Sequence, residues 1–177
     1  MKNEVEKGFI HVYYGDGKGK TSSAIGLAIR SAGAGLKVYF GRFLKDSNSS
    51  ELSVLKEISN ITLSDIPPKL PFYFTMSQKE KEDYKKYAHQ LLKSLIERFS
   101  YFDVVILDEF LDAVTLGIFT EEEIEDFLKF KPSNVELVLT GHELISVLKE
   151  KADYLSYIKC ERHPYFDGIS ARKGIEY

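Results

Sequence analysis

The chain has 177 residues, of which 44% are hydrophobic and 29% are charged, which fits one ordinary domain with a buried core. The net charge of −3 gives the protein no general attraction to nucleic acid or to an anionic membrane. No apolar run approaches the ~20 residues of a membrane-spanning helix, and the polar N-terminal tail, residues 1–7, lacks the apolar core of a signal peptide.

The first half of the chain alternates between strand and helix patterns. The segment FIHVYY is β-branched and aromatic and is bounded by glycines, which is typical of a strand. An alanine-, isoleucine- and leucine-rich segment that is typical of a helix follows it. Prolines exclude a regular helix from the segment PPKLPFYF. The predicted elements are a strand at 9–14, a helix at 20–32 ending near Gly33 and Gly35, a strand at 37–44, a short helix at 51–58, a strand at 61–66 and an irregular segment at 67–74.

The second half continues the alternation and adds capping signals. Ser77 with Glu80 forms a capping box for a long helix that ends near Phe99, and Thr120 with Glu123 caps another helix. The continuous apolar run DVVILDE predicts a strand that is covered on both faces. Further elements are predicted as strands at 103–109, 135–141 and 154–159 and a helix at about 143–151. This alternation predicts a single α/β domain over residues 1–177, with a doubly wound, mostly parallel sheet.

The segment GDGKGKTS follows the first predicted strand and opens the first predicted helix, which is the setting of a phosphate-binding loop. Its glycines allow backbone N–H groups to approach phosphate oxygens, and the helix N-terminus adds partial positive charge. Lys20 is expected to neutralise phosphate, and Thr21 to ligate Mg²⁺ through its hydroxyl. Tyr14 occupies the position of the first glycine in the usual pattern, so the loop is a variant; the alternative is a glycine-rich turn with solvated lysines. The candidate nucleotide-binding residues of the loop are Gly15, Asp16, Gly17, Lys18, Gly19, Lys20, Thr21 and Ser22.

Three further segments are candidates for the same ligand-binding edge, because parallel sheets bind ligands beyond the carboxyl ends of their strands. Asp108 and Glu109 close an apolar strand and predict a Walker B-like metal site, with two solvated helix-capping acids as the alternative. His142, which follows Thr140–Gly141, is expected either to touch phosphate or nucleotide or to begin a helix without a ligand. By residue type alone, the three aromatic residues of PFYF, at 71–74, are expected to pack in the core or in a lid.

Together these segments resemble the P-loop ATP:corrinoid adenosyltransferases, which attach the adenosyl group of ATP to the cobalt of cobalamin and related corrinoids. The resemblance covers nearly the whole chain and implies that the sheet is of the P-loop NTPase-like (RecA-like) type. It includes YGDGKGKTS without the first glycine, AIRSAGAGLKV, FLK at 43–45, VVILDE, LTG at 139–141 and the ending HPYFDGISARKGIEY. That ending is characteristic of the family and is not shared by P-loop ATPases of other kinds.

The resemblance implies roles for individual residues. Residues 15–22 would wrap the triphosphate of ATP, which the family binds with reversed polarity in its loop. Thr21 and Glu109 match the family's magnesium ligands, and Arg30 matches an arginine near the nucleotide–corrinoid site. Phe72 and Phe74 match an aromatic pair that packs under the corrin ring.

Two loop-edge positions differ from the usual family pattern. Asp16 stands where an asparagine is commoner, and His142 stands where the family usually has an arginine. A histidine is shorter than an arginine and can be neutral at physiological pH.

The implied reaction needs no side-chain nucleophile or general base, because Co(I) is itself a strong nucleophile. It would attack the 5′ carbon of ATP and release triphosphate, whose charge Lys20, Mg²⁺ and backbone amides would stabilise. The sequence accordingly contains no clear nucleophile–base pair. The alternatives are a P-loop small-molecule kinase, which needs a phosphoacceptor base and usually a lid arginine, and a nucleotide-binding regulator without turnover.

The resemblance also implies partners, namely a reductase or flavoprotein that supplies Co(I) and a second copy of the chain in a homodimer. The single cysteine, Cys160, cannot form an internal disulfide, which fits a cytoplasmic location. Cys160 and His163 together are too few for a zinc site.

Overall fold

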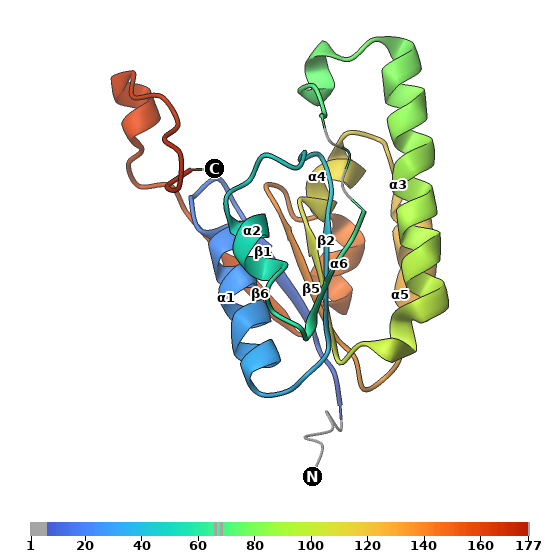
Figure 1. Cartoon of the computed structure of the whole chain (residues 1–177). Coiled ribbons are helices and arrows are strands. Elements are labelled where there is room, and N and C mark those ends of the chain that lie inside the picture. The colour runs from blue at the N-terminus through green and yellow to red at the C-terminus, as the bar shows by residue number, and fades with distance from the viewer. Residues whose placement is uncertain (1–6, 66, 68, 177) are drawn as a thin grey trace.

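The computed structural model describes residues 7–65, 67 and 69–176. Residues 1–6 of the predicted N-terminal tail, and Ile66, Pro68 and Tyr177 of the predicted segments, lie outside the described residues. Within the described part, six strands form one sheet in the order β3-β2-β4-β5-β1-β6, and all neighbouring strands are parallel (Figure 1). The strands are β1 (Ile10–Tyr14), β2 (Val38–Arg42), β3 (Ile61–Leu63), β4 (Val104–Asp108), β5 (Glu136–Gly141) and β6 (Tyr154–Tyr157). The predicted α/β fold with a parallel sheet is therefore confirmed.

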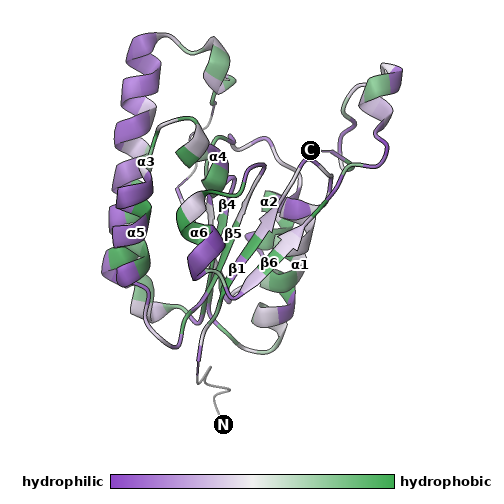
Figure 2. Ribbon diagram, turned by 180° about the vertical axis from the view of Figure 1, so that it is seen from behind, coloured by the Kyte–Doolittle hydropathy of each residue, from purple (hydrophilic) through white to green (hydrophobic). Residues whose placement is uncertain are grey.

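Helices cover both faces of the sheet, which gives a three-layer architecture (Figures 1 and 2). One face packs against α1 and α2, and the opposite face packs against α3, α4, α5 and α6. The helices are α1 (Lys20–Gly33), α2 (Glu51–Leu55), α3 (Gln78–Arg98), α4 (Phe110–Thr115), α5 (Glu121–Lys129) and α6 (Ser146–Lys151).

The central strand β4 shows why the sheet needs two helical layers. All five of its residues are buried. Val105 and Leu107 belong to the apolar cluster on the α3 side, whereas Val104 and Ile106 belong to the cluster on the α1 side. Side chains alternate between the two faces of a strand, so a strand buried on both faces has a continuous apolar sequence. The opposite extreme is β6, an edge strand whose residues are all exposed.

The two predicted capping boxes are both present. The Ser77 hydroxyl accepts a hydrogen bond from the Glu80 N–H at the start of α3, and Thr120 and Glu123 make the same exchange at the start of α5. No helix of the described part of the chain has the length and apolar character required to cross a bilayer.

Several local features differ from the predicted elements or were not predicted. α4 follows Glu109 directly and was not predicted, and α6 begins at Ser146 instead of near residue 143 because Ile145 has an extended backbone. The predicted irregular segment runs into a 3₁₀ turn at Tyr73–Thr75, and further 3₁₀ turns lie at Phe99–Tyr101 and Pro164–Asp167. The turns at Tyr73–Thr75 and Pro164–Asp167 project on opposite sides beyond the carboxyl edge of the sheet (Figure 1).

Candidate active site

The phosphate-binding loop joins β1 to α1 at the carboxyl edge of the sheet. Gly15 has a φ of 119°, a left-handed conformation that favours glycine, and an added Cβ would lie 2.4 Å from the carbonyl oxygen of Ile158. The Gly17 N–H donates a 2.8 Å hydrogen bond to the same Ile158 oxygen. Two of the three loop glycines therefore allow the loop to pack against the chain that follows β6.

Lys20, the first residue of α1, directs its side chain back into the loop. Its ammonium donates to the carbonyl oxygens of Gly15 at 2.7 Å and Gly17 at 3.0 Å, and the residue is 7% exposed. A lysine positive charge and the N-terminus of a 14-residue helix therefore meet at one point. Such a point attracts phosphate.

A cluster of oxygen ligands lies next to the loop, between the start of α1 and the end of β4. The Thr21 hydroxyl donates to Asp108 Oδ1 at 2.9 Å. The ammonium of Lys45, which follows β2, contacts Thr21 Oγ1 at 3.0 Å, Asp108 Oδ2 at 2.8 Å and Glu109 Oε1 at 2.9 Å. Asp108 is fully buried. Three oxygen atoms therefore surround one cation, and this donor set has the chemistry that Mg²⁺ prefers.

Glu109 reaches this cluster through an uncommon backbone conformation. Its φ is 57°, and its N–H donates to the Thr140 hydroxyl at 2.9 Å, which in turn donates to Asp108 Oδ1 at 2.7 Å. Leu44, the residue before Lys45, has a φ of 55°. These are the only residues other than glycine with a positive φ among the described positions, and such strain is concentrated at functional sites.

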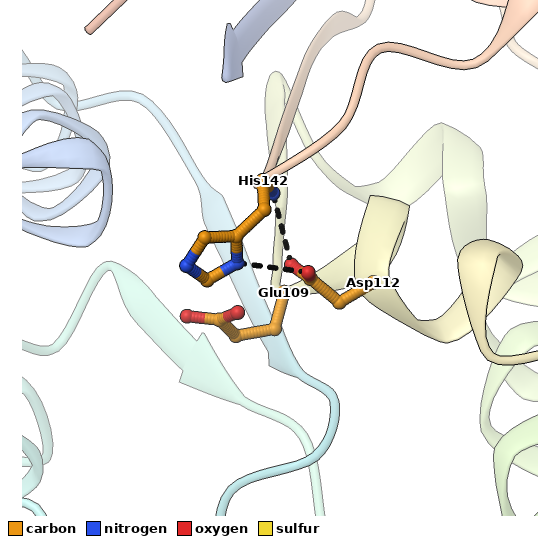
Figure 3. Close-up of side chains that lie close together, drawn as sticks. All are labelled: Glu109, Asp112 and His142. Carbon is orange, nitrogen blue, oxygen red and sulfur yellow. Dashed lines mark hydrogen bonds and ion pairs between the residues drawn. The ribbon is translucent and has the colours of Figure 1, made fainter. Parts of the chain in front are cut away.

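A second group of ligands shares Glu109 and extends to β5 (Figure 3). Asp112, in the first turn of α4, accepts hydrogen bonds from the His142 N–H at 3.2 Å and from the His142 ring nitrogen Nδ1 at 2.8 Å. Ligand atoms of Glu109, Asp112 and His142 all lie within 4.8 Å of one another. This group contains an imidazole and suits a divalent transition metal better than Mg²⁺.

Gly141 makes the contact between α4 and β5 possible. A Cβ at this position would lie 2.5 Å from Leu111 Cβ and 2.7 Å from Asp112 Oδ2. Any larger residue would push α4 away from the strand. The glycine of the Leu-Thr-Gly motif therefore allows Asp112 to hold His142.

The charged groups of the site shift one another's pKa values. Burial raises the pKa of Glu109, and the charge of Lys45 opposes this change. Burial lowers the pKa of Lys45, but the charges of Asp108 and Glu109 outweigh burial and raise it overall. The hydrogen bond to Asp112 is the main reason why the pKa of His142 is raised. Lys45 is therefore a cation at neutral pH, and His142 stays protonated to a higher pH than an ordinary histidine.

The remaining predicted loop residues point elsewhere. Asp16 accepts a hydrogen bond from the Cys160 N–H at 3.1 Å, and the Lys18 ammonium bonds to Glu176 at 2.9 Å. Ser22 is exposed near the start of α1. Arg30 is exposed ten residues beyond Lys20 on the same helix, which corresponds to about 15 Å along the axis. The structure therefore does not bring Arg30 next to the loop.

The aromatic pair of the irregular segment lies on the surface. Phe72 is 86% exposed and Phe74 is 83% exposed, on the turn that projects beyond the sheet. Tyr73 between them packs against the core, with its ring 6.4 Å from that of Tyr84. Of the two expected placements, core or lid, the core is therefore wrong for both phenylalanines, and their packing in a lid stays a prediction.

Two residues of this site, Lys45 and Asp112, were not predicted from the sequence to have a functional role. Lys45 follows a strand by three residues in the conspicuous segment FLK, which was a signal for a residue at the ligand-binding edge. Asp112 lies three residues after Glu109, a spacing that places both on one face if a helix begins there. That helix, α4, has only six residues and leaves little periodicity to detect.

A parallel α/β sheet with a glycine-rich loop, a buried lysine and an acidic strand end defines the class of P-loop nucleotide-binding proteins. A family model described as ATP:corrinoid adenosyltransferase BtuR/CobO/CobP matches residues 6–177. The chain belongs to this family of enzymes, as the sequence motifs predicted.

Curated relatives agree with the family match. A corrinoid adenosyltransferase of Escherichia coli K12 is 27% identical over 172 residues, covering 97% of this chain and 87% of the relative. A corrinoid adenosyltransferase of Sinorhizobium sp. is 30% identical over 183 residues, covering 97% and 81%. Domain III of the Thermotoga maritima replication initiation protein DnaA aligns with a TM-score of 0.38 and 15% identity over 89% of this chain and 57% of that one, which is too low to support a conclusion.

Proposed function

We propose that this protein transfers the 5′-deoxyadenosyl group of ATP to the Co(I) centre of cobalamin or a related corrinoid. Co(I) attacks the 5′ carbon, a cobalt–carbon bond forms, and the bond from that carbon to the triphosphate oxygen breaks. Both electrons of the broken bond leave with triphosphate. The observation that supports this proposal best is the variant loop with Lys20 inside it, next to Thr21 and the acidic end of β4, in a chain of this family.

Lys20 and the loop amides are the groups that stabilise the leaving triphosphate. Lys20 is already held between two carbonyl oxygens of the loop, so little reorganisation is needed when the charge of the leaving group develops. No proton has to be removed from the nucleophile. The site therefore needs positioned positive charge and alignment of the reactants, and it needs no general base.

Thr21 and Glu109 are the proposed magnesium ligands. Their oxygen atoms, together with Asp108, already surround a cation in the structure. When bound, Mg²⁺ supplies further positive charge to the phosphate oxygens. His142, held by Asp112 and raised in pKa, would place another cation near the triphosphate, although its side chain is shorter than an arginine.

Phe72 and Phe74 are the proposed contacts for the lower face of the corrin ring. Both are exposed on a projecting turn, where they are free to pack against a large flat ligand. An apolar wall there would exclude water and a lower axial ligand from cobalt, which eases reduction of Co(II) to Co(I). The proposal further includes a reductase or flavoprotein as electron donor, a homodimer and a cytoplasmic location.

Product analysis tests the reaction directly. The protein is incubated with ATP, Mg²⁺ and chemically reduced cobalamin, and the absorbance spectrum and the phosphate products are recorded. We expect adenosylated corrinoid and inorganic triphosphate in equal amounts. ADP as the product would instead indicate a phosphate-transferring kinase, and no turnover would indicate a nucleotide-binding regulator.

A further inference from the structure

Lys45 occupies the centre of the oxygen cluster that is proposed to bind magnesium. An ammonium has three N–H donors, and each of the three finds one acceptor here, on Thr21, Asp108 and Glu109, at 2.8–3.0 Å. The three N–H donors of the ammonium are therefore all used by these three acceptors. It also provides the counter-charge that the fully buried Asp108 requires.

The backbone on both sides of the contact is strained. Leu44 adopts a left-handed conformation, and its N–H donates a 2.6 Å hydrogen bond to the Tyr84 hydroxyl. Glu109 adopts the same conformation on the opposite side of the ion pair. Tyr84 belongs to α3 and is largely buried, so the conformation of Leu44 is fixed by the core and directs Lys45 into the cluster.

A lysine ammonium and a magnesium ion cannot share this position. Mg²⁺ binds oxygen at about 2.1 Å, so it would have to lie between the same three atoms that the ammonium now contacts. Two cations so close together repel strongly in a partly buried site. One of them must therefore leave when the other binds.

We propose that Lys45 competes with the metal ion for this site. Its ammonium binds the three oxygens until Mg²⁺·ATP arrives, and the side chain then moves so that the ammonium pairs with the triphosphate. This proposal rests on the proposed function, in which Thr21 and Glu109 bind Mg²⁺. The triphosphate gives the displaced ammonium a new anionic partner, and the metal replaces it at the carboxylates. Binding of metal is thereby coupled to binding of nucleotide, and metal alone is bound weakly.

Replacing Lys45 by methionine keeps the length of the side chain and removes the charge. Binding of Mn²⁺, a paramagnetic substitute for Mg²⁺, is measured by electron paramagnetic resonance in the absence of nucleotide. We expect Lys45→Met to bind Mn²⁺ at least about tenfold more tightly than the wild type, because two carboxylates lose their internal counter-ion. The same variant should bind Mg²⁺·ATP more weakly, because the triphosphate loses a lysine contact. A purely structural lysine would not produce opposite changes in these two affinities.

Two variants serve as controls. Lys56→Met makes the same chemical change at an exposed position and should match the wild type in both affinities. Lys45→Met combined with Asp108→Asn should lose the gain in Mn²⁺ affinity. If Lys45→Met is unstable without metal, millimolar Mn²⁺ should raise its thermal midpoint clearly more than that of the wild type, because a ligand of the native state stabilises it.

The outcomes separate this proposal from the proposed function. Equal Mn²⁺ affinity and equal metal-induced stabilisation in Lys45→Met and the wild type would overturn the role of Lys45. If Glu109→Gln nevertheless reduces turnover at limiting Mg²⁺, the proposed magnesium site stands without the competitor. If adenosyl transfer itself fails but Lys45→Met gains Mn²⁺ affinity, the competition stands and the reaction is wrong.

Discussion

Replacing Lys20 by alanine removes the positive charge from the centre of the phosphate-binding loop. In the structure this ammonium is 7% exposed and donates to two loop carbonyls, at 2.7 Å and 3.0 Å. Hydrogen bonds from charged groups contribute about 1.5–3 kcal/mol each, but Lys20, Gly15 and Gly17 are all buried, so the variant also removes the cost of keeping an ammonium away from water. We therefore expect the free energy of unfolding to fall by about 1–3 kcal/mol in total, which a folded domain can tolerate.

The effect on the reaction should be larger than the effect on stability. A preorganised cation at a developing negative charge contributes about 2–4 kcal/mol to the transition state, which corresponds to a loss of roughly a hundredfold in rate. The assay follows adenosylcobalamin formation by absorbance with pre-formed Co(I) and saturating Mg²⁺·ATP, while thermal unfolding monitors the fold. Lys37→Ala, at an exposed position, is the matched control. A loss below about threefold with unchanged ATP affinity would refute the reasoning, because a triphosphate in this loop must depend on its buried lysine.

The remaining predictions concern the metal, the corrinoid and the histidine. Glu109→Gln should keep the shape of the site but raise the Mg²⁺ concentration needed for turnover, and wild-type turnover at limiting Mg²⁺ would contradict the metal assignment. Phe72→Ala and Phe74→Ala should change the free energy of unfolding by no more than about 0.5 kcal/mol, because both side chains are exposed. They should reduce turnover more with a weak physiological reductant than with pre-formed Co(I), and equal losses in both assays would reject the proposed aromatic wall. Asp112→Asn should lower the pKa of His142 in an NMR titration, because Asp112 is the main cause of the raised value. Since that pKa is raised in the folded state, the stability contributed by the pair is complete below about pH 6.5 and is lost as the pH rises through the folded pKa; a stability difference between Asp112→Asn and the wild type that grows with rising pH would contradict this.

The sequence predicts the sheet well because the amino-acid composition of each strand reflects how far its two faces are buried. The apolar run before Asp108 is continuous because both faces of β4 are covered, and the glycine-bounded aromatic run before Gly15 marks β1. Capping boxes are equally local, since the Ser77 and Glu80 side chains exchange hydrogen bonds within one turn. Such signals need no knowledge of the rest of the chain.

The site was predictable only where its residues follow a recognised local motif. Lys20 and Thr21 belong to the loop motif, and the structure brings Thr21 to Asp108 as the order of the strands implies. Lys45 meets Asp108 across 63 residues of sequence, and no local pattern encodes that pairing. The exposure of Phe72 was also not predictable, because a proline-rich segment with aromatic residues has the same local sequence whether those side chains are buried or exposed.

β1 is the first strand of the chain, yet it lies between β5 and β6, the last two. The loop that follows it is fixed by contacts that span most of the sequence, such as the hydrogen bond from the Cys160 N–H to Asp16, 144 residues apart. Contacts of this kind form late in folding because a long stretch of chain must first be ordered. During synthesis, the phosphate-binding motif therefore emerges before β5 and β6 but acquires its shape only after they have formed. A partly made chain would carry the motif as an open loop, and the ability to bind the triphosphate would appear only when β6 has joined the sheet and residues 158–160 have packed against the loop.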